Sequence, residues 1–218
     1  MPDLAPLDSG DFYFVDAMDA DEAVRKLLTI VQERIPKRFG FDAVRDVQVL
    51  CPMNRGSLGA RSLNIELQKA LNPPGEIHIE RFGWTFCLGD KVMQTENDYD
   101  KEVYNGDLGV VSRIDMEEGE LTANFDGRDV IYGFGERDEL VLAYATTIHK
   151  SQGSEYPAVV IPLSVQHYPM LQRNLVYTGV TRGKGLVVLV GQRKALAIVV
   201  KGDRKRRRWS KLREWLTC

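Results

Sequence analysis

Residues 47–71 read VQVLCPMNRGSLGARSLNIELQKAL and contain a strand, a turn and a helix in succession. The first five residues are mostly apolar and β-prone, as expected of a buried strand that ends before a proline. After the Gly-containing turn, four apolar residues recur at three- and four-residue spacing between Leu63 and Leu71, which predicts a helix that Asn72, Pro73 and Pro74 stop. This strand–helix alternation predicts an α/β layer built on a parallel sheet.

The same alternation occurs upstream and downstream of this stretch. Upstream, the β-prone run Asp11–Val15 precedes a helix that Asp19 is expected to cap and Pro36 to end. Downstream, 158–163 (AVVIPL) and 186–191 (LVVLVG) are expected to be buried strands. Helices are predicted at 171–180 and after residue 191, so the chain is expected to be α/β on both sides of its middle segment.

The middle of the chain has a different pattern. Between Gly89 and Leu140 only short strand-like runs occur, and turn signals such as Asn105-Gly106 and Asp126-Gly127 separate them. Several short strands at this spacing predict a small β-barrel. We therefore expect one α/β domain built from residues 11–83 and 141–218, with a β-barrel subdomain of residues 84–140 inserted into it.

Composition fits a globular protein and excludes several classes. Apolar residues make up 44% and charged residues 28% of 218 residues, and the formal net charge is −2. The three cysteines are scattered, and no signal pattern or bilayer-length apolar run occurs, so the sequence predicts a cytoplasmic protein without a membrane span. The small net charge does not exclude nucleic acid as a partner, because local fields matter more than the sum.

The segment Tyr144–Tyr156, YATTIHKSQGSEY, concentrates polar and small residues after a predicted strand. Hydroxyl and imidazole groups can donate hydrogen bonds to phosphate oxygens, which positions a nucleic-acid strand without reading its sequence. Gly153 would let the backbone approach a ligand closely, and a carboxylate such as Glu155 can accept hydrogen bonds from ribose hydroxyls. The alternative is an ordinary polar loop that follows a strand and binds no ligand.

Two arginines stand at the edges of predicted elements. Arg182 lies where a helix ends and the strand of residues 186–191 follows, and Arg55 comes directly after the strand of residues 47–51. A guanidinium group is always charged and suits phosphate geometry, and α/β sheets place ligands at strand ends. Taken singly, either residue could also be a solvated surface arginine.

These segments together resemble superfamily 1 DNA helicases of the RecD and TraA-like branch. IHKSQGSEY looks like motif V, VYTGVTRGK like motif VI and CPMNRGSLG like motif IV of that branch. GDKVMQTENDYDKEVYNGDLG resembles the segment that enters the family's small β-barrel. The resemblance covers about residues 11–216, with the four segments in the family's order.

The resemblance implies a RecA-like second motor domain that shares an ATP site with a first domain. The family's first domain carries the phosphate-binding loop, but G-x-x-x-x-G-K-[ST] does not occur here; the nearest string, Arg182-Gly183-Lys184-Gly185, lacks its Ser or Thr. No acidic pair at a strand end is evident as a Mg²⁺ site. The chain is therefore expected to be the C-terminal part of an ATP-dependent helicase, inactive alone, with the Mg²⁺ ligands on the missing N-terminal motor domain.

The resemblance also implies roles for particular residues. The arginines expected at the γ-phosphate of ATP are Arg182 and Arg55, and the residues expected to line the nucleotide are Gly153 and Glu155. The residues expected to contact single-stranded DNA are Thr146, Thr147, His149 and, in the insert, Asn105. Translocation in the 5′-to-3′ direction is expected from the family. Whether the parent acts alone or in a RecBCD-like complex stays open.

Three other functions compete with the motor interpretation. A non-catalytic nucleic-acid-binding module of a repair or exonuclease complex would suit a small β-barrel beside the basic run of residues 201–208, but it would not need Arg55, Glu155 and Arg182. A nuclease would need a carboxylate cluster with metal-ligand spacing, which is not evident. A plain structural domain would leave the four ordered motifs unexplained. The basic run adjoins Trp209, Leu212 and Trp215, whose spacing equally predicts a short amphipathic helix.

Overall fold

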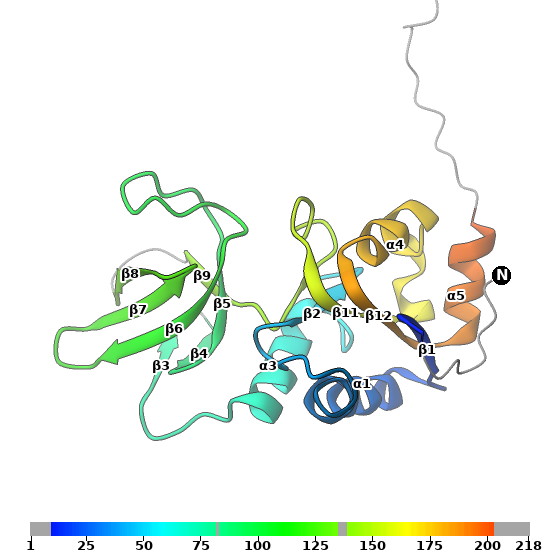
Figure 1. The fold of residues 1–218 in the computed structure, drawn as a ribbon, viewed down its shortest axis with the longest axis horizontal. Helices are drawn as coiled ribbons and strands as arrows, with labels where there is room; N and C mark the ends of the chain where they lie inside the picture. The colour runs from blue at the N-terminus through cyan, green and yellow to red at the C-terminus, as the bar shows by residue number, and fades with distance from the viewer. Residues whose placement is uncertain (1–9, 82, 135–138, 203–218) are drawn as a thin grey trace, which may run out of the picture.

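The protein folds as a mixed α/β structure with a parallel sheet and an antiparallel sheet side by side (Figure 1). The computed structural model describes residues 10–81, 83–134 and 139–202. The basic run beyond residue 203 and the amphipathic helix predicted around Trp209 lie outside these residues. Among the described helices, none has the length and apolar content needed to cross a bilayer.

The parallel sheet has the strand order β1-β12-β11-β2-β10. Its strands are β1 (Phe12–Asp16), β12 (Gly183–Gly191), β11 (Tyr156–Leu163), β2 (Val47–Cys51) and β10 (Ala145–Thr147). Every neighbouring pair is parallel, and Val160 of β11 lies level with Val49 on one side and Val188 on the other. The expected α/β fold is thereby confirmed.

Helices cover both faces of this sheet, because its strands are apolar on both sides. In β11, Val160 packs into the cluster that contains Leu27 and Leu63, whereas the next residue, Ile161, packs into the cluster that contains Leu175. The first cluster includes residues of α1 (Ala20–Thr29) and α3 (Ala60–Leu71), and the second includes residues of α4 (Arg173–Val180) and α5 (Arg193–Lys201). Figure 1 shows these two helix pairs on opposite sides of the sheet.

The first helical segment begins as predicted but continues past its expected end. Asp19 caps α1 by accepting a hydrogen bond from the Glu22 amide at 2.8 Å. The chain then forms the π-helical turn η1 (Ile30–Arg34) and the helix α2 (Ile35–Phe39), so the prediction that Pro36 ends the helix is wrong. The wider turn places Pro36 in the first turn of α2, where a missing N–H and a bulky ring are tolerated. Gly40, at φ 73°, ends the segment.

The inserted region forms a five-stranded antiparallel sheet, and its predicted closure into a barrel is not confirmed. Its order is β8-β7-β6-β5-β9, with β5 (Lys91–Gln94), β6 (Leu108–Asp115), β7 (Glu120–Phe125), β8 (Arg128–Gly133) and β9 (Leu140–Leu142). A separate hairpin pairs β3 (His78–Arg81) with β4 (Trp84–Cys87). Within the described residues no pairing joins the edge strands β8 and β9. The predicted Asp126-Gly127 turn is confirmed, with φ of 51° and 89°.

The two sheets are joined by a buried polar junction at Asp90. The Asp90 carboxylate accepts hydrogen bonds from Gln68 (2.6 Å) and Asn72 (2.7 Å) of the α3 segment, from Tyr144 Oη (2.8 Å) and from the Cys87 amide (2.7 Å). Burial raises the pKa of Asp90, and these four donors oppose that rise. The junction therefore ties the insert to α3 and to the residues that lead into β10.

A second connection at the same junction is made by backbone and by a buried cation. The Ala143 amide donates to the Lys91 carbonyl (2.8 Å), while the Val49 amide donates to the Tyr144 carbonyl (3.2 Å). The ammonium group of Lys91 is buried and donates to the Val47 carbonyl at 3.1 Å, and burial lowers the pKa of Lys91 to about 8. The linker of residues 143–144 between the two sheets is thus hydrogen-bonded to β5 on one side and to β2 on the other.

Candidate nucleotide and nucleic-acid site

The segment of residues 148–154 forms a short turn between β10 and β11. Ile148 is fully buried, and its amide donates to the Cys51 carbonyl at 3.0 Å. The hydroxyl of Ser151 closes the turn on the Ile148 carbonyl at 2.8 Å. Gly153 has a φ of 92°, a conformation that side-chain-bearing residues rarely adopt. The backbone conformation alone therefore favours glycine at this position, whether or not a ligand approaches it closely.

Arg182 lies at the end of α4, and its guanidinium group packs against the end of this turn. It donates to the Ser154 carbonyl (3.1 Å), the Thr178 carbonyl (3.3 Å) and the Thr181 hydroxyl (3.3 Å). The amide of Tyr156 in turn donates to the Arg182 carbonyl at 2.8 Å. A guanidinium group has five N–H donors, so three bonds hold it in place and leave donors for a further acceptor.

Glu155 lies beside Arg182 and forms an ion pair with Lys184 at 3.0 Å. The hydrogen bond from Lys184 and its charge, with a smaller contribution from Arg182, lower the pKa of Glu155. Both side chains of the pair are more than half exposed. Sequence reasoning missed Lys184 as a site residue, because only the pairing of Tyr156 with Gly183 across β11 and β12 brings it to Glu155.

The residues predicted to touch DNA differ in how the structure exposes them. His149 is exposed, and its ring makes no hydrogen bond within the described part of the chain. Thr147 is half-buried, and its hydroxyl accepts a hydrogen bond from the Lys150 amide at 3.4 Å. Thr146 is only 4% exposed within β10, so its side chain offers a ligand almost no surface.

The two predicted phosphate-binding arginines adjoin opposite ends of the parallel strands. Arg55 follows the carboxyl end of β2, where Cys51 pairs with Thr147. Arg182 precedes the amino end of β12, where Gly183 pairs with Tyr156. Since β2 and β11 are parallel and the two levels are six residues apart, about 20 Å of strand separates them. The register thus separates the two strand ends, and the role of both arginines at one γ-phosphate stays a prediction.

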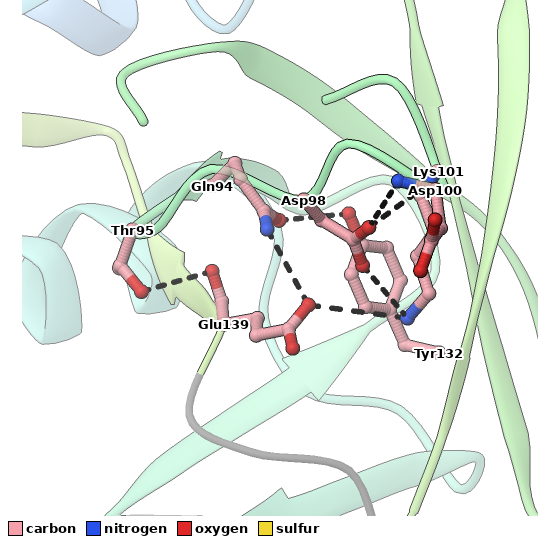
Figure 2. Close-up of polar contacts among 7 residues, drawn as sticks. All are labelled: Gln94, Thr95, Asp98, Asp100, Lys101, Tyr132 and Glu139. Atoms are coloured by element: carbon pink, nitrogen blue, oxygen red, sulfur yellow. Dashed lines mark hydrogen bonds and ion pairs between the residues drawn. The ribbon is translucent and has the colours of Figure 1, made fainter. Parts of the chain in front are cut away.

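Asn105, the DNA candidate in the insert, is exposed in the loop between β5 and β6 (Figure 1). Its backbone N–H donates to the side-chain oxygen of Asn97 at 2.9 Å. Figure 2 shows the polar contacts that brace this loop: Lys101 lies 3.8 Å from Asp98 and 3.9 Å from Glu139. The loop is thus held in place while Asn105 is left exposed.

No metal site is evident in the part of the chain that the structure describes. Within residues 10–81, 83–134 and 139–202, no three His, Cys, Asp or Glu side chains gather closely enough to hold an ion. The structure therefore assigns no Mg²⁺ ligand to these residues.

Two family models match the chain. The model described as the ATP-dependent RecD-like DNA helicase SH3 domain matches residues 63–125. The model described as the UvrD-like helicase C-terminal domain matches residues 142–190. The first match covers most of the insert together with most of α3, and the second covers the turn, Arg182 and Lys184.

Curated relatives and a solved structure agree with these matches. The chain is 42% identical over 161 residues to the ATP-dependent RecD2 DNA helicase of Deinococcus radiodurans, and 32% identical over 160 residues to the RecBCD enzyme subunit RecD of Haemophilus influenzae. These alignments cover 74% and 73% of the chain but only 22% and 24% of the relatives. The fold is similar to that of a Pif1 helicase from Bacteroides crystallised with ADP-AlF3 and single-stranded DNA, at a TM-score of 0.50 and 20% identity, covering 78% of this chain and 45% of that one.

Proposed function

Because the chain belongs to the RecD-like superfamily 1 helicases and represents their C-terminal region, we propose that it is the second motor domain of an ATP-dependent DNA helicase. In this proposal the domain supplies half of an ATP site and part of the grip on single-stranded DNA. The phosphate-binding loop and the Mg²⁺ ligands come from a separate N-terminal motor domain. The two domains close on ATP and open after hydrolysis, which moves one grip along the strand.

The observation that carries the ATP half of the proposal is the cluster of Arg182, Glu155 and Lys184. Three hydrogen bonds hold the Arg182 guanidinium without consuming all of its donors. A preorganised, permanently charged group of this kind stabilises charge that develops on a transferring phosphoryl group. Arg182 is therefore proposed to act as the arginine finger.

Glu155 and Gly153 are proposed to line the nucleotide beside this arginine. The carboxylate of Glu155 is exposed and ionised, and a carboxylate has more acceptor sites than its ion pair with Lys184 uses. A ribose hydroxyl can thus donate to Glu155 while the ion pair persists. Lys184, which the pairing of β11 with β12 brings here, would fix the orientation of that carboxylate.

The DNA half of the proposal concerns residues at the other end of the parallel sheet and one loop of the insert. His149, Thr147 and Asn105 remain the proposed contacts to the strand, and Thr146 could take part through its backbone only, because its side chain is buried. Arg55 was expected at the γ-phosphate, and that role stays a prediction. Arg55 follows β2, whose last residue, Cys51, pairs with Thr147, so the DNA backbone is proposed as its alternative ligand.

The remaining parts of the proposal concern the whole protein. The insert is proposed to be a subdomain of about residues 84–140, although β3 lies before this range and β9 crosses its end. Movement in the 5′-to-3′ direction and membership of a RecBCD-like complex are proposals drawn from the family alone, whereas action inside the cytoplasm is proposed from the cysteine pattern of the sequence.

Two measurements on the chain itself test this proposal. Because no phosphate-binding loop is present, the pure chain should not turn over ATP. It should bind single-stranded oligonucleotides weakly and lose that binding steeply as salt rises, because phosphate contacts release counterions. Steady ATP turnover, or binding that salt does not affect, would contradict the division of labour proposed here.

A further inference from the structure

A small cavity lies between the 148–154 turn and α4, beside His149. Its volume is about 160 Å³, which corresponds to roughly five water molecules at about 30 Å³ each. Its lining residues are His149, Gln152, Met170, Gln172, Asn174, Leu175 and Thr178. The cavity is therefore large enough for a flat organic group and not only for a single water.

Three of the five polar side chains that line the cavity are unused by the fold, whereas Gln172 donates to the Pro169 carbonyl at 3.5 Å and Thr178 to the Asn174 carbonyl at 2.9 Å. His149, Gln152 and Asn174 make no side-chain hydrogen bonds within the described residues. An amide offers two donors and an acceptor, and a neutral imidazole offers one of each. Together these groups match a ligand that presents donors and acceptors along one edge.

The charge of the lining distinguishes between the two parts of a nucleotide. Neither Lys nor Arg is among the described residues that line the cavity. A phosphate group is usually held by cations or by backbone amides, whereas nucleobases are neutral and are recognised through their edges and faces. Met170 and the nearly buried Leu175 add a small apolar surface that a base can contact.

We propose that this cavity receives one unstacked nucleobase of the single-stranded DNA. The inference rests on the proposed function, since it places the base beside the strand that His149 is proposed to contact. It goes beyond that function, because the grip would include a base and not only the phosphate backbone. Asn174 and Gln152 would hydrogen-bond to the base edge, and Leu175 would contact its face.

The test compares two oligomers of equal length and equal charge. One is a short oligothymidylate and the other carries abasic residues throughout, and the binding of each to the chain is measured by fluorescence anisotropy at low salt. We expect the abasic oligomer to bind about tenfold more weakly, towards the low end of what one base contributes in proteins that stack bases on aromatic rings. Equal affinity for the two oligomers would overturn the base pocket and leave the proposed function intact.

The variant Asn174→Ala distinguishes a pocket that binds a base from a site that binds phosphate. It should weaken binding of the oligothymidylate several-fold and leave the abasic oligomer unaffected. Gln166→Ala, which removes an exposed amide outside the cavity, is the matched control and should change neither. If Asn174→Ala weakens both oligomers equally, the cavity holds phosphate and the inference fails. If the wild-type chain binds neither oligomer, the proposed function fails and the inference fails with it.

Discussion

The cluster around Arg182 and the junction around Asp90 are both built from charged and polar side chains. They differ in how many donors and acceptors remain without a hydrogen-bond partner. Asp90 is fully buried and accepts from four donors. Arg182 is half-buried and retains donors, and the neighbouring Glu155 is exposed. A buried network that is satisfied stabilises one structure. An exposed one with spare donors is prepared to bind a ligand.

The largest effect that this comparison predicts is on catalysis. In a helicase that contains this region together with its first motor domain, Arg182→Ala should lower DNA-stimulated ATP hydrolysis by about 10³- to 10⁵-fold, as loss of an arginine finger does elsewhere. Lys should not restore the rate, because it lacks the planar fork. Arg193→Ala removes an exposed arginine that pairs with Asp16 and serves as the control. A fall in the ATP hydrolysis rate of less than about tenfold would show that Arg182 does not act as the arginine finger.

The next effect is on stability at the junction. Asp90→Ala should lower the free energy of unfolding of the chain by roughly 4 kcal/mol, because three buried donors and the partly buried Asn72 lose their acceptor at about 1 kcal/mol or more each. Chemical denaturation measures the change. Glu66→Ala, which removes only an exposed carboxylate near Lys69, is the control. If Asp90→Ala unfolds at the same denaturant concentration as the wild type, the junction is not the structural element described here.

Lys91 gives the junction a dependence on pH. Burial lowers its pKa from 10.5 to about 8, so between these pH values the unfolded chain binds more protons than the folded one. Stability contributed through Lys91 therefore rises with pH across this window, by about 3 kcal/mol. The variant Lys91→Met should remove that rise. Parallel pH profiles of unfolding for the two proteins would show that the ammonium group is not buried.

The smallest expected effect is on the stability of the exposed cluster. Lys184→Ala breaks the ion pair with Glu155, in which both side chains are solvent-exposed and screened. The denaturation midpoint should therefore stay at the wild-type value. A clear shift of that midpoint would mean that the Arg182 cluster is structural, which would remove its contrast with the junction.

The sequence was sufficient for the α/β fold because buried strands and helical spacing are local signals. The Asp19 cap and the Asp126-Gly127 turn were likewise predicted, since each depends on adjacent residues. The prediction from Pro36 was wrong, because a π-helical turn precedes it and leaves it in the first turn of α2. The pairing of Lys184 with Glu155 and the opposite strand ends that Arg55 and Arg182 adjoin could not be predicted, because both follow from strand order and register.

The central claim is that the Arg182 end of the sheet serves the nucleotide and the His149 end serves the DNA. The most direct test is the affinity for single-stranded DNA of Arg182→Ala and His149→Ala, measured by anisotropy in the same helicase. We predict wild-type affinity for Arg182→Ala and a clear loss for His149→Ala, with a shallower dependence on salt if His149 contacts phosphate. Weakened DNA binding by Arg182→Ala, together with unchanged ATP turnover, would contradict the claim.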